Sequence, residues 1–122
     1  MHHSYNEDFW GAIDDLVRSG NIIIDRPRNS SHPRFPNIIY PVDYGYIDST
    51  KSMDGGGIDI WRGTLEDSTV RAIICTVDLK KRDSEIKLLI GCTEDEICSV
   101  YNFHNNTEYM KGLLIYRQEI EV

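Results

Sequence analysis

The sequence lacks the features that mark membrane proteins, disulfide-bonded secreted domains and nucleic-acid-binding proteins. No apolar run approaches the roughly 20 residues that a membrane-spanning helix needs. The three cysteines form no Cys-x-x-Cys pair and, being odd in number, cannot all be joined in disulfides within one chain. Lys and Arg number 13 against 20 Asp and Glu, which gives a net charge of −7. These absences exclude membrane insertion and argue against nucleic acid as the main partner, because phosphate backbones require a surplus of cations.

The chain also has no internal repeat, no low-complexity tract and no linker. Its 122 residues suffice for one hydrophobic core and are too few for two, so we predict a single domain over residues 1–122. There is no apolar leader at the N-terminus. Together with the unpaired cysteines, this predicts a reducing, cytoplasmic location. The sequence leaves open whether copies of the chain assemble into a homo-oligomer.

Apolar periodicity and turn residues predict a small α+β domain. An amphipathic helix is expected over Asn6–Ser19, and the capping box Thr93-Glu-Asp-Glu96 predicts a second helix that reaches about Phe103. β-branched content predicts strands at 22–24, 38–39, 57–62, 70–78, 86–91 and 112–117. Between residues 26 and 36 three prolines indicate an extended, turn-rich crossing. The predicted fold is an OB-like closed β-barrel with an N-terminal helix and a C-terminal helix.

The segment that is most informative about function is Tyr40-Pro-Val-Asp-Tyr-Gly-Tyr-Ile47, followed by Asp54-Gly-Gly-Gly-Ile-Asp59. The three glycines carry no Cβ, so the backbone between Asp54 and Asp59 can fold tightly enough to aim both carboxylates at one point. A hard cation such as Mg²⁺ takes oxygen ligands and usually arrives with phosphate. The pattern therefore predicts a site for a metal ion and a phosphate compound.

This segment resembles the family I soluble inorganic pyrophosphatases. Their pattern reads Tyr-Pro-x-x-Tyr-Gly-Tyr-Ile and, a few residues later, Asp-Gly-Asp-Pro-x-Asp. Here Gly56 stands where the family has its middle aspartate, and a hairpin that carries an arginine is missing between Pro36 and Tyr40. The resemblance to a shortened, divergent member implies hydrolysis of inorganic pyrophosphate, or of another small phosphoanhydride, with Mg²⁺ or Mn²⁺ as cofactor.

The resemblance also implies roles for individual residues. The implied metal ligands are Asp54, Asp59 and Glu85. The implied catalytic residues are Asp54, Asp59, Tyr44 and Asp25, and the implied substrate-binding residues are Arg34, Tyr40 and Lys87. Glu85 and Lys87 are two residues apart on a predicted strand, so their side chains should face the same side.

Three positions depart from the family pattern where it has acids for further metal ions and for the attacking water. These positions are Gly56, Lys80 and Pro36. Water activation would then fall to the metal alone or to a nearby acid, for which Asp43 and Asp25 are the candidates. We therefore expect a slower enzyme than a full-length relative.

Each assignment has a plainer structural alternative. Asp54 and Asp59 would also suit ordinary turns beside glycines. The tyrosines at 40, 44 and 46 would suit packing in the barrel, which is the favoured role for Tyr46. The acid and lysine at 85 and 87 would suit an exposed ion pair. The arginines between 26 and 34 would suit a solubilising loop, and the sequence does not say which of them would replace the missing hairpin arginine: Arg26, Arg28 or Arg34.

Two rival functions stay open. In the first, the chain is a degenerate relative that binds pyrophosphate, a nucleotide or a metal without turnover. In the second, the barrel binds single-stranded nucleic acid, as OB-like barrels often do. The acidic charge balance speaks against the second.

Overall fold

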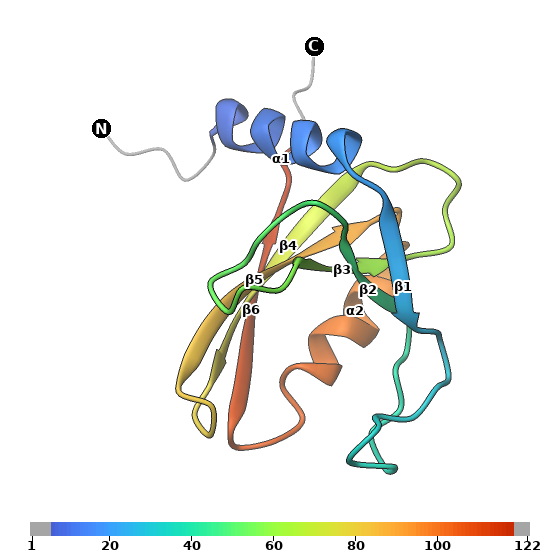
Figure 1. Cartoon of the computed structure of the whole chain (residues 1–122). Helices are drawn as coiled ribbons and strands as arrows, with labels where there is room; N and C mark the ends of the chain where they lie inside the picture. Colours follow the sequence, from blue (N-terminus) through green and yellow to red (C-terminus); the bar gives the residue numbers. More distant parts are fainter. Residues whose placement is uncertain (1–5, 119–122) are drawn as a thin grey trace.

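The computed structural model describes residues 6–118, which form one six-stranded sheet and two helices (Figure 1). The elements in chain order are α1 (Glu7–Ser19), β1 (Ile22–Arg26), β2 (Asp43–Ile47), β3 (Ile58–Arg62), β4 (Val70–Asp78), β5 (Asp83–Ile90), α2 (Glu94–Phe103) and β6 (Met110–Tyr116). Their order across the sheet is β1-β2-β3-β5-β4-β6. Neighbouring strands are antiparallel except β3 and β5, which run parallel.

The sheet is open. β1 and β6 form its two edges, and within residues 6–118 they do not pair with one another. The α+β class is therefore confirmed, whereas the predicted closed barrel is not. The chain leaves the sheet at Pro27, directly after β1, and proline cannot donate to a strand ladder. As a result β1 ends at Arg26 after five residues; as an edge strand it pairs only with β2.

Both predicted helices are confirmed, and so is the capping box at Thr93; Asn6, predicted as the first helical residue, is the N-cap of α1. The Asn6 side chain accepts the backbone N–H of Asp8 at 2.9 Å, and Thr93 forms both halves of the capping box with Glu96. The strand predicted at 38–39 is wrong, since only an isolated bridge joins Ser31 to Ile39. Strand β2 was not predicted, because its tyrosines and glycine hid the alternation of a strand.

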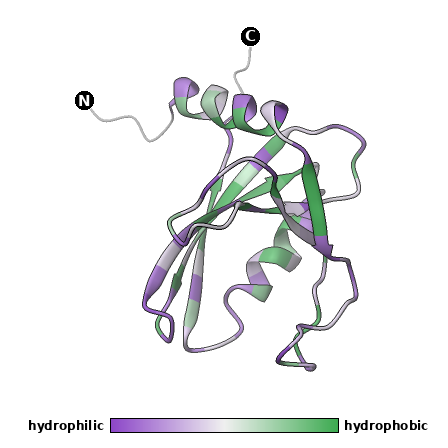
Figure 2. Ribbon diagram, viewed as in Figure 1, coloured by the Kyte–Doolittle hydropathy of each residue, from purple (hydrophilic) through white to green (hydrophobic). Residues whose placement is uncertain are grey.

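The two faces of the sheet carry separate hydrophobic clusters. The first lies under α1 and contains Trp10, Ile13, Val17, Ile47, Ile60, Val70, Ile73, Leu88 and Ile90. The second lies under α2 and contains Tyr40, Val42, Trp61, Ala72, Ile74, Leu89, Cys92, Ile97 and Val100. Figure 2 shows hydrophobic residues along the central strands and hydrophilic ones on the outward side of α1. We call these surfaces the α1 face and the α2 face.

Neither of the two helices between residues 6 and 118 has the length and apolarity that crossing a membrane would require.

Candidate functional site

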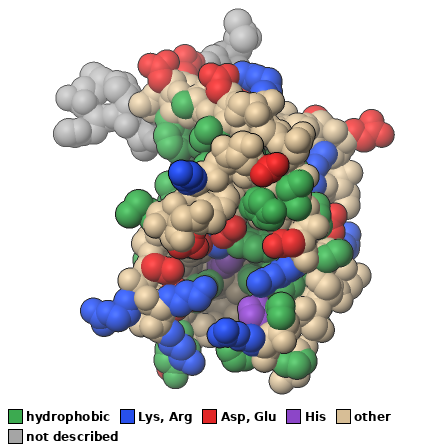
Figure 3. All heavy atoms as spheres, viewed as in Figure 1, with side chains coloured by type: hydrophobic (Ala, Val, Ile, Leu, Met, Phe, Trp, Pro, Cys, Tyr) green, Lys and Arg blue, Asp and Glu red, His purple; other side chains and the backbone are tan. Residues whose placement is uncertain are grey.

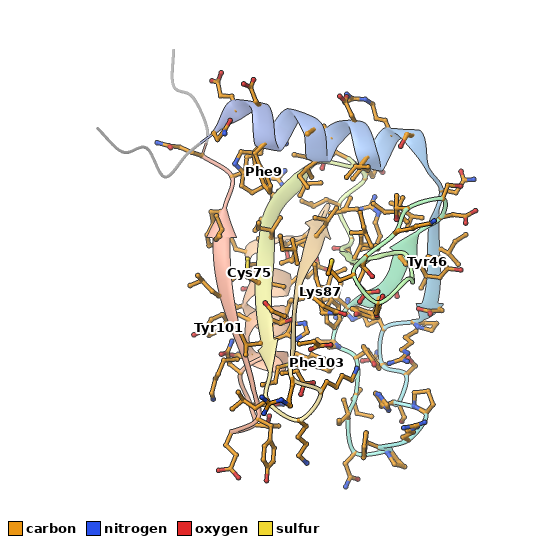
Figure 4. The ribbon with its side chains drawn as sticks, turned by 60° about the vertical axis from the view of Figure 1, so that its left-hand side comes forward. Phe9, Tyr46, Cys75, Lys87, Tyr101 and Phe103 are labelled. Carbon is orange, nitrogen blue, oxygen red and sulfur yellow. The ribbon has the colours of Figure 1, made fainter. Side chains whose placement is uncertain are left out.

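A buried lysine joins three side chains on the α2 face. The Nζ atom of Lys87 donates hydrogen bonds to Tyr44 Oη at 2.7 Å, to Asp59 Oδ2 at 2.9 Å and to Glu85 Oε2 at 2.9 Å. The Lys87 side chain is only 8% exposed, against 31% for Asp59 and 22% for Glu85. Figure 4 shows Lys87 near the middle of the domain. We call these four residues the Lys87 cluster.

Strand alternation explains why these residues meet. Tyr44, Asp59 and Lys87 come from β2, β3 and β5, which are consecutive in the sheet. Asp59 lies two residues before the buried Trp61, and Tyr44 pairs with Trp61 in register, so all three side chains face α2. Glu85 lies on the same face as Lys87, as their spacing predicted. The Lys87 cluster is therefore a polar group of side chains beside the hydrophobic cluster of the α2 face.

Two members of the cluster, Lys87 and Tyr44, have pKa values shifted from their usual range. Burial alone would lower the pKa of Lys87, but Tyr44 and Asp59 outweigh it and hold the pKa above its usual value. Burial raises the pKa of Tyr44 by more than the charge of Lys87 lowers it. The phenol therefore stays neutral and can donate a hydrogen bond. One ammonium faces two carboxylates, which leaves one uncompensated negative charge. That charge favours a further cation over a free anion.

Asp54 does not reach the cluster. Its side chain is exposed, and its Oδ1 accepts the Ser52 hydroxyl and the Gly56 N–H, the latter at 3.0 Å. These two hydrogen bonds lower the pKa of Asp54. The arrangement is that of a turn acid, the plainer alternative at this position. Of the three acids implied as metal ligands, Asp59 and Glu85 are brought together, whereas Asp54 is bound to its own loop.

The oxygen donors of the Lys87 cluster suit a metal ion that substrate phosphates also bind, and do not suit a metal ion held by protein ligands alone. Within the described chain, no group of three or more His, Cys, Asp or Glu residues could hold a metal ion. Asp59 and Glu85 nevertheless direct hard oxygen donors at a single point, the Nζ of Lys87, with both distances 2.9 Å. Mg²⁺ is commonly bound by one or two carboxylates together with substrate phosphates. The residues fit a metal that brings further ligands with it.

Tyr40 lies deeper than a substrate-binding role suggests. It is 3% exposed, and its hydroxyl accepts a hydrogen bond from Arg26 Nη1. Its ring centroid is 5.5 Å from that of Tyr44. Tyr40 therefore connects Arg26 to the Lys87 cluster through packed aromatic rings.

A β-bulge aims Arg26 at the α2 face. The register of β1 against β2 shifts between Ile24 and Arg26, so Asp25 is an extra residue on β1. Ile24 packs against the α1-face cluster, whereas Arg26 contacts Tyr40 on the opposite face. In a regular strand, residues 24 and 26 would point to the same face. The bulge thus distinguishes Arg26 from the other two arginines, while Asp25 itself is exposed.

Gly45 explains the glycine within the tyrosine motif. A Cβ atom at this position would lie 1.8 Å from the carbonyl oxygen of Ile23, so only glycine lets β1 approach β2 so closely. A Cβ at Gly57 would lie 2.7 Å from the Tyr46 ring. Tyr46 therefore covers the end of the glycine loop, which agrees with the packing role offered as its alternative.

Cationic side chains from β1 and from two loops lie around His32. Burial lowers the pKa of His32, and the charges of Arg26, Lys81 and Arg34 lower it further. Arg26 is the last residue of β1, Arg34 belongs to the crossing that follows it, and Lys81 to the turn between β4 and β5. Figure 3 shows a hollow in the lower half of the molecule, with Lys and Arg side chains on its flanks and Asp and Glu above it. This surface suits an anionic ligand that is accompanied by a cation.

Sequence reasoning did not identify the support behind the cluster. Trp61 Nε1 donates to Nε2 of His104 at 3.2 Å, and both residues are buried. Burial, assisted by the charge of Lys87, lowers the pKa of His104 to about 3, so the ring is neutral and can accept this hydrogen bond. His104 is therefore a buried packing residue of the α2 face. Nothing in the local sequence showed its partner, which lies 43 residues away.

No protein-family model matches the chain, and no curated protein is significantly similar to it in sequence. Among solved structures, it is similar to an inorganic pyrophosphatase from Coxiella burnetii with a TM-score of 0.59. The sequence identity is 16%, and the match covers 78% of this chain and 84% of the other. This likeness shows a pyrophosphatase-like fold.

Proposed function

We propose that this protein hydrolyses inorganic pyrophosphate, or another small phosphoanhydride, with Mg²⁺ or Mn²⁺ as cofactor. The observation that supports this most is the Lys87 cluster, in which an ammonium, a neutral phenol and two carboxylates converge from adjacent strands of a pyrophosphatase-like fold. Phosphoryl transfer needs positioning and charge stabilisation more than covalent chemistry from the protein.

The residues of the site fall into two groups, those that would bind the metal ion and those that would bind the phosphates. Asp59 and Glu85 would hold the divalent ion, which when bound neutralises charge on the phosphate oxygens. Lys87 and Tyr44 would donate hydrogen bonds to the phosphates, and Arg26 would supply the charge of the missing hairpin arginine. Arg34, on the exposed crossing, would attract the anion to the hollow.

Asp54 is the third acid assigned to the metal. It is on the exposed loop that leads into β3, and joining the metal would require it to give up its hydrogen bonds to Ser52 and Gly56. Water activation falls to Asp25 or Asp43, since Gly56 offers no carboxylate. Turnover should therefore be slow.

The second candidate is binding of the same ligand without turnover. Two observations favour it: the glycine at position 56, and the Asp54 side chain bound within its own turn. The two candidates share the site and differ only in whether water is activated.

The deciding experiment measures phosphate release from pyrophosphate with Mg²⁺ and then Mn²⁺, beside the Asp59→Asn and Asp54→Asn variants. Release by the parent and not by Asp59→Asn supports hydrolysis and excludes a contaminating host enzyme. Loss in Asp54→Asn as well would bring the loop acid into the site. Calorimetric binding of Mn²⁺–pyrophosphate without release supports the second candidate, and neither release nor binding refutes both.

A further inference from the structure

We propose that Lys87 is an internal counter-ion that occupies the cation position between Asp59 and Glu85 in the free protein and leaves it only when a metal and a phosphoanhydride bind together. The proposal rests on the proposed function and adds to it the order of binding. The protein would recognise the metal–phosphate complex and bind the free metal poorly.

The hydrogen bonds of Lys87 are already fully used. An ammonium has three N–H donors, and Tyr44, Asp59 and Glu85 accept one each, at 2.7, 2.9 and 2.9 Å. No donor is left for a phosphate oxygen. Lys87 can bind substrate only after at least one of these bonds breaks.

One oxygen of each carboxylate is bound to the same ammonium. Asp59 Oδ2 and Glu85 Oε2 both bind Nζ, so a divalent ion that used these two oxygens would have to take the place of the ammonium. In the structure, Lys87 therefore occupies the point at which these two oxygens would bind a metal ion. One displacement of Nζ releases both.

The charges explain why the ligands should bind together. Metal alone would leave the Lys87 ammonium, 8% exposed, buried without a counter-charge. Phosphate alone would add negative charge beside two carboxylates that already exceed their ammonium by one. When both ligands bind, the metal neutralises the carboxylates and the phosphate neutralises Lys87. Such coupling is reciprocal, so each ligand raises the affinity of the other.

The first test removes the internal cation. Lys87→Met keeps the length of the side chain and abolishes its charge, and Mn²⁺ binding without pyrophosphate is measured by electron paramagnetic resonance of the free ion. We expect the variant to bind Mn²⁺ at least about tenfold more tightly than the parent. The matched control is Lys111→Met, an exposed lysine that donates to the Thr107 carbonyl and changes the net charge equally. It should leave Mn²⁺ affinity unchanged.

Equal Mn²⁺ affinity in the parent and Lys87→Met, or an equal gain in Lys111→Met, overturns the proposal. A second measurement on the parent keeps the test open should Lys87→Met fail to fold. The ¹⁵N signal of the Lys87 ammonium should stay in place with Mg²⁺ alone and shift when Mg²⁺ is added with methylenediphosphonate, which cannot be hydrolysed. A shift with Mg²⁺ alone, or none with both ligands, overturns the proposal.

These readouts do not depend on turnover. Coupled binding without phosphate release would support the role of Lys87 and refute hydrolysis. Phosphate release with uncoupled binding would support hydrolysis and refute the role of Lys87.

Discussion

The two faces of the sheet use the same strands for different purposes. On the α1 face the central strands present Ile47, Ile60 and Leu88, and the helix covers them with Trp10 and Ile13. On the α2 face the same strands present Tyr44, Asp59 and Lys87 beside Trp61 and Leu89. The α1 face contributes apolar burial, which drives folding, and the α2 face interrupts its core with charge.

The difference between the two faces indicates that the α2 face, with its buried charges, is the candidate functional face. Buried charge costs free energy unless it is paired, so a buried lysine with two carboxylates is weak support for stability. The fold tolerates the cluster because the opposite face carries a continuous apolar core. Variants that affect one face and spare the other can test this division.

The largest contrast is expected between two neighbours in β3 that point to opposite faces. Ile60→Ala removes fully buried apolar volume on the α1 face and should lower the free energy of unfolding by about 2–5 kcal/mol. Asp59→Asn should cost less stability and yet abolish metal–pyrophosphate binding. Urea unfolding and calorimetry measure the two effects. If Asp59→Asn destabilises as much as Ile60→Ala, the α2 face is as structural as the α1 face.

The next effect is a gain of activity. Gly56 lacks the left-handed backbone that marks Gly55, and a Cβ there would meet only the movable Asp54 carboxylate, at 3.3 Å. Gly56→Asp should therefore fold and place a carboxylate where the resembled pyrophosphatase pattern has its middle aspartate. We expect the rate of phosphate release to rise about tenfold or more, as a positioned base can provide.

Gly56→Ala is the control for that gain, since it restricts the loop without adding a carboxylate. It should leave the rate near that of the parent. An equal rise in both variants would attribute the effect to loop stiffness. No rise in Gly56→Asp would show that the missing acid is not what limits the rate.

A smaller effect should appear with pH. The pKa of His104 is lowered to about 3 in the fold, whereas an unfolded histidine titrates near 6.5. Between these values the unfolded state binds more protons, so stability is fully present above pH 6.5 and is lost as the pH falls. We expect the free energy of unfolding to drop by about 1 kcal/mol from pH 7 to pH 5.5.

His104→Gln provides the comparison, because its amide oxygen can still accept the Trp61 N–H and it does not titrate. The variant should lose less stability over the same pH interval. Equal losses in parent and variant would assign the pH dependence to another group.

The smallest effect is expected at the bulge. Asp25→Asn should change the rate of phosphate release by only about twofold, since an exposed bulge residue acts mainly through backbone geometry. Deletion of Asp25 should instead remove the bulge and leave Arg26 opposite Tyr44 and facing α2, so pyrophosphate binding should weaken less than in Arg26→Ala. A large loss of rate in Asp25→Asn would identify it as the base that activates water.

Local signals predicted more of this molecule than long-range ones. Apolar periodicity predicted the first helix, the capping box at Thr93 predicted the start of the second, and the spacing of Glu85 and Lys87 placed them on one face. These inferences use neighbours within one turn or one strand. The set of metal ligands, Asp54, Asp59 and Glu85, came from the resemblance. Asp54 is held away from the other two by hydrogen bonds within its loop, and three consecutive glycines allow too many backbone conformations for these bonds to be predicted.

Long-range pairing accounts for the rest. Whether β1 would meet β6 depends on the path of the 26–36 crossing, and the closed barrel was expected without that information. The direction of Arg26 depends on one extra residue in β1, which shows only against its partner strand. The partner of His104 lies on another element altogether.

The chain has only two tryptophans, and each lies in the core of a different face. Trp61 stands edge-on to Tyr44, with their ring centroids 4.6 Å apart, so its emission should respond when Lys87 releases the phenol. Trp10 lies on the opposite side of the sheet and should not respond. In a Trp10→Phe background the remaining indole would report optically on the site, and ligand binding could be followed in real time without a label.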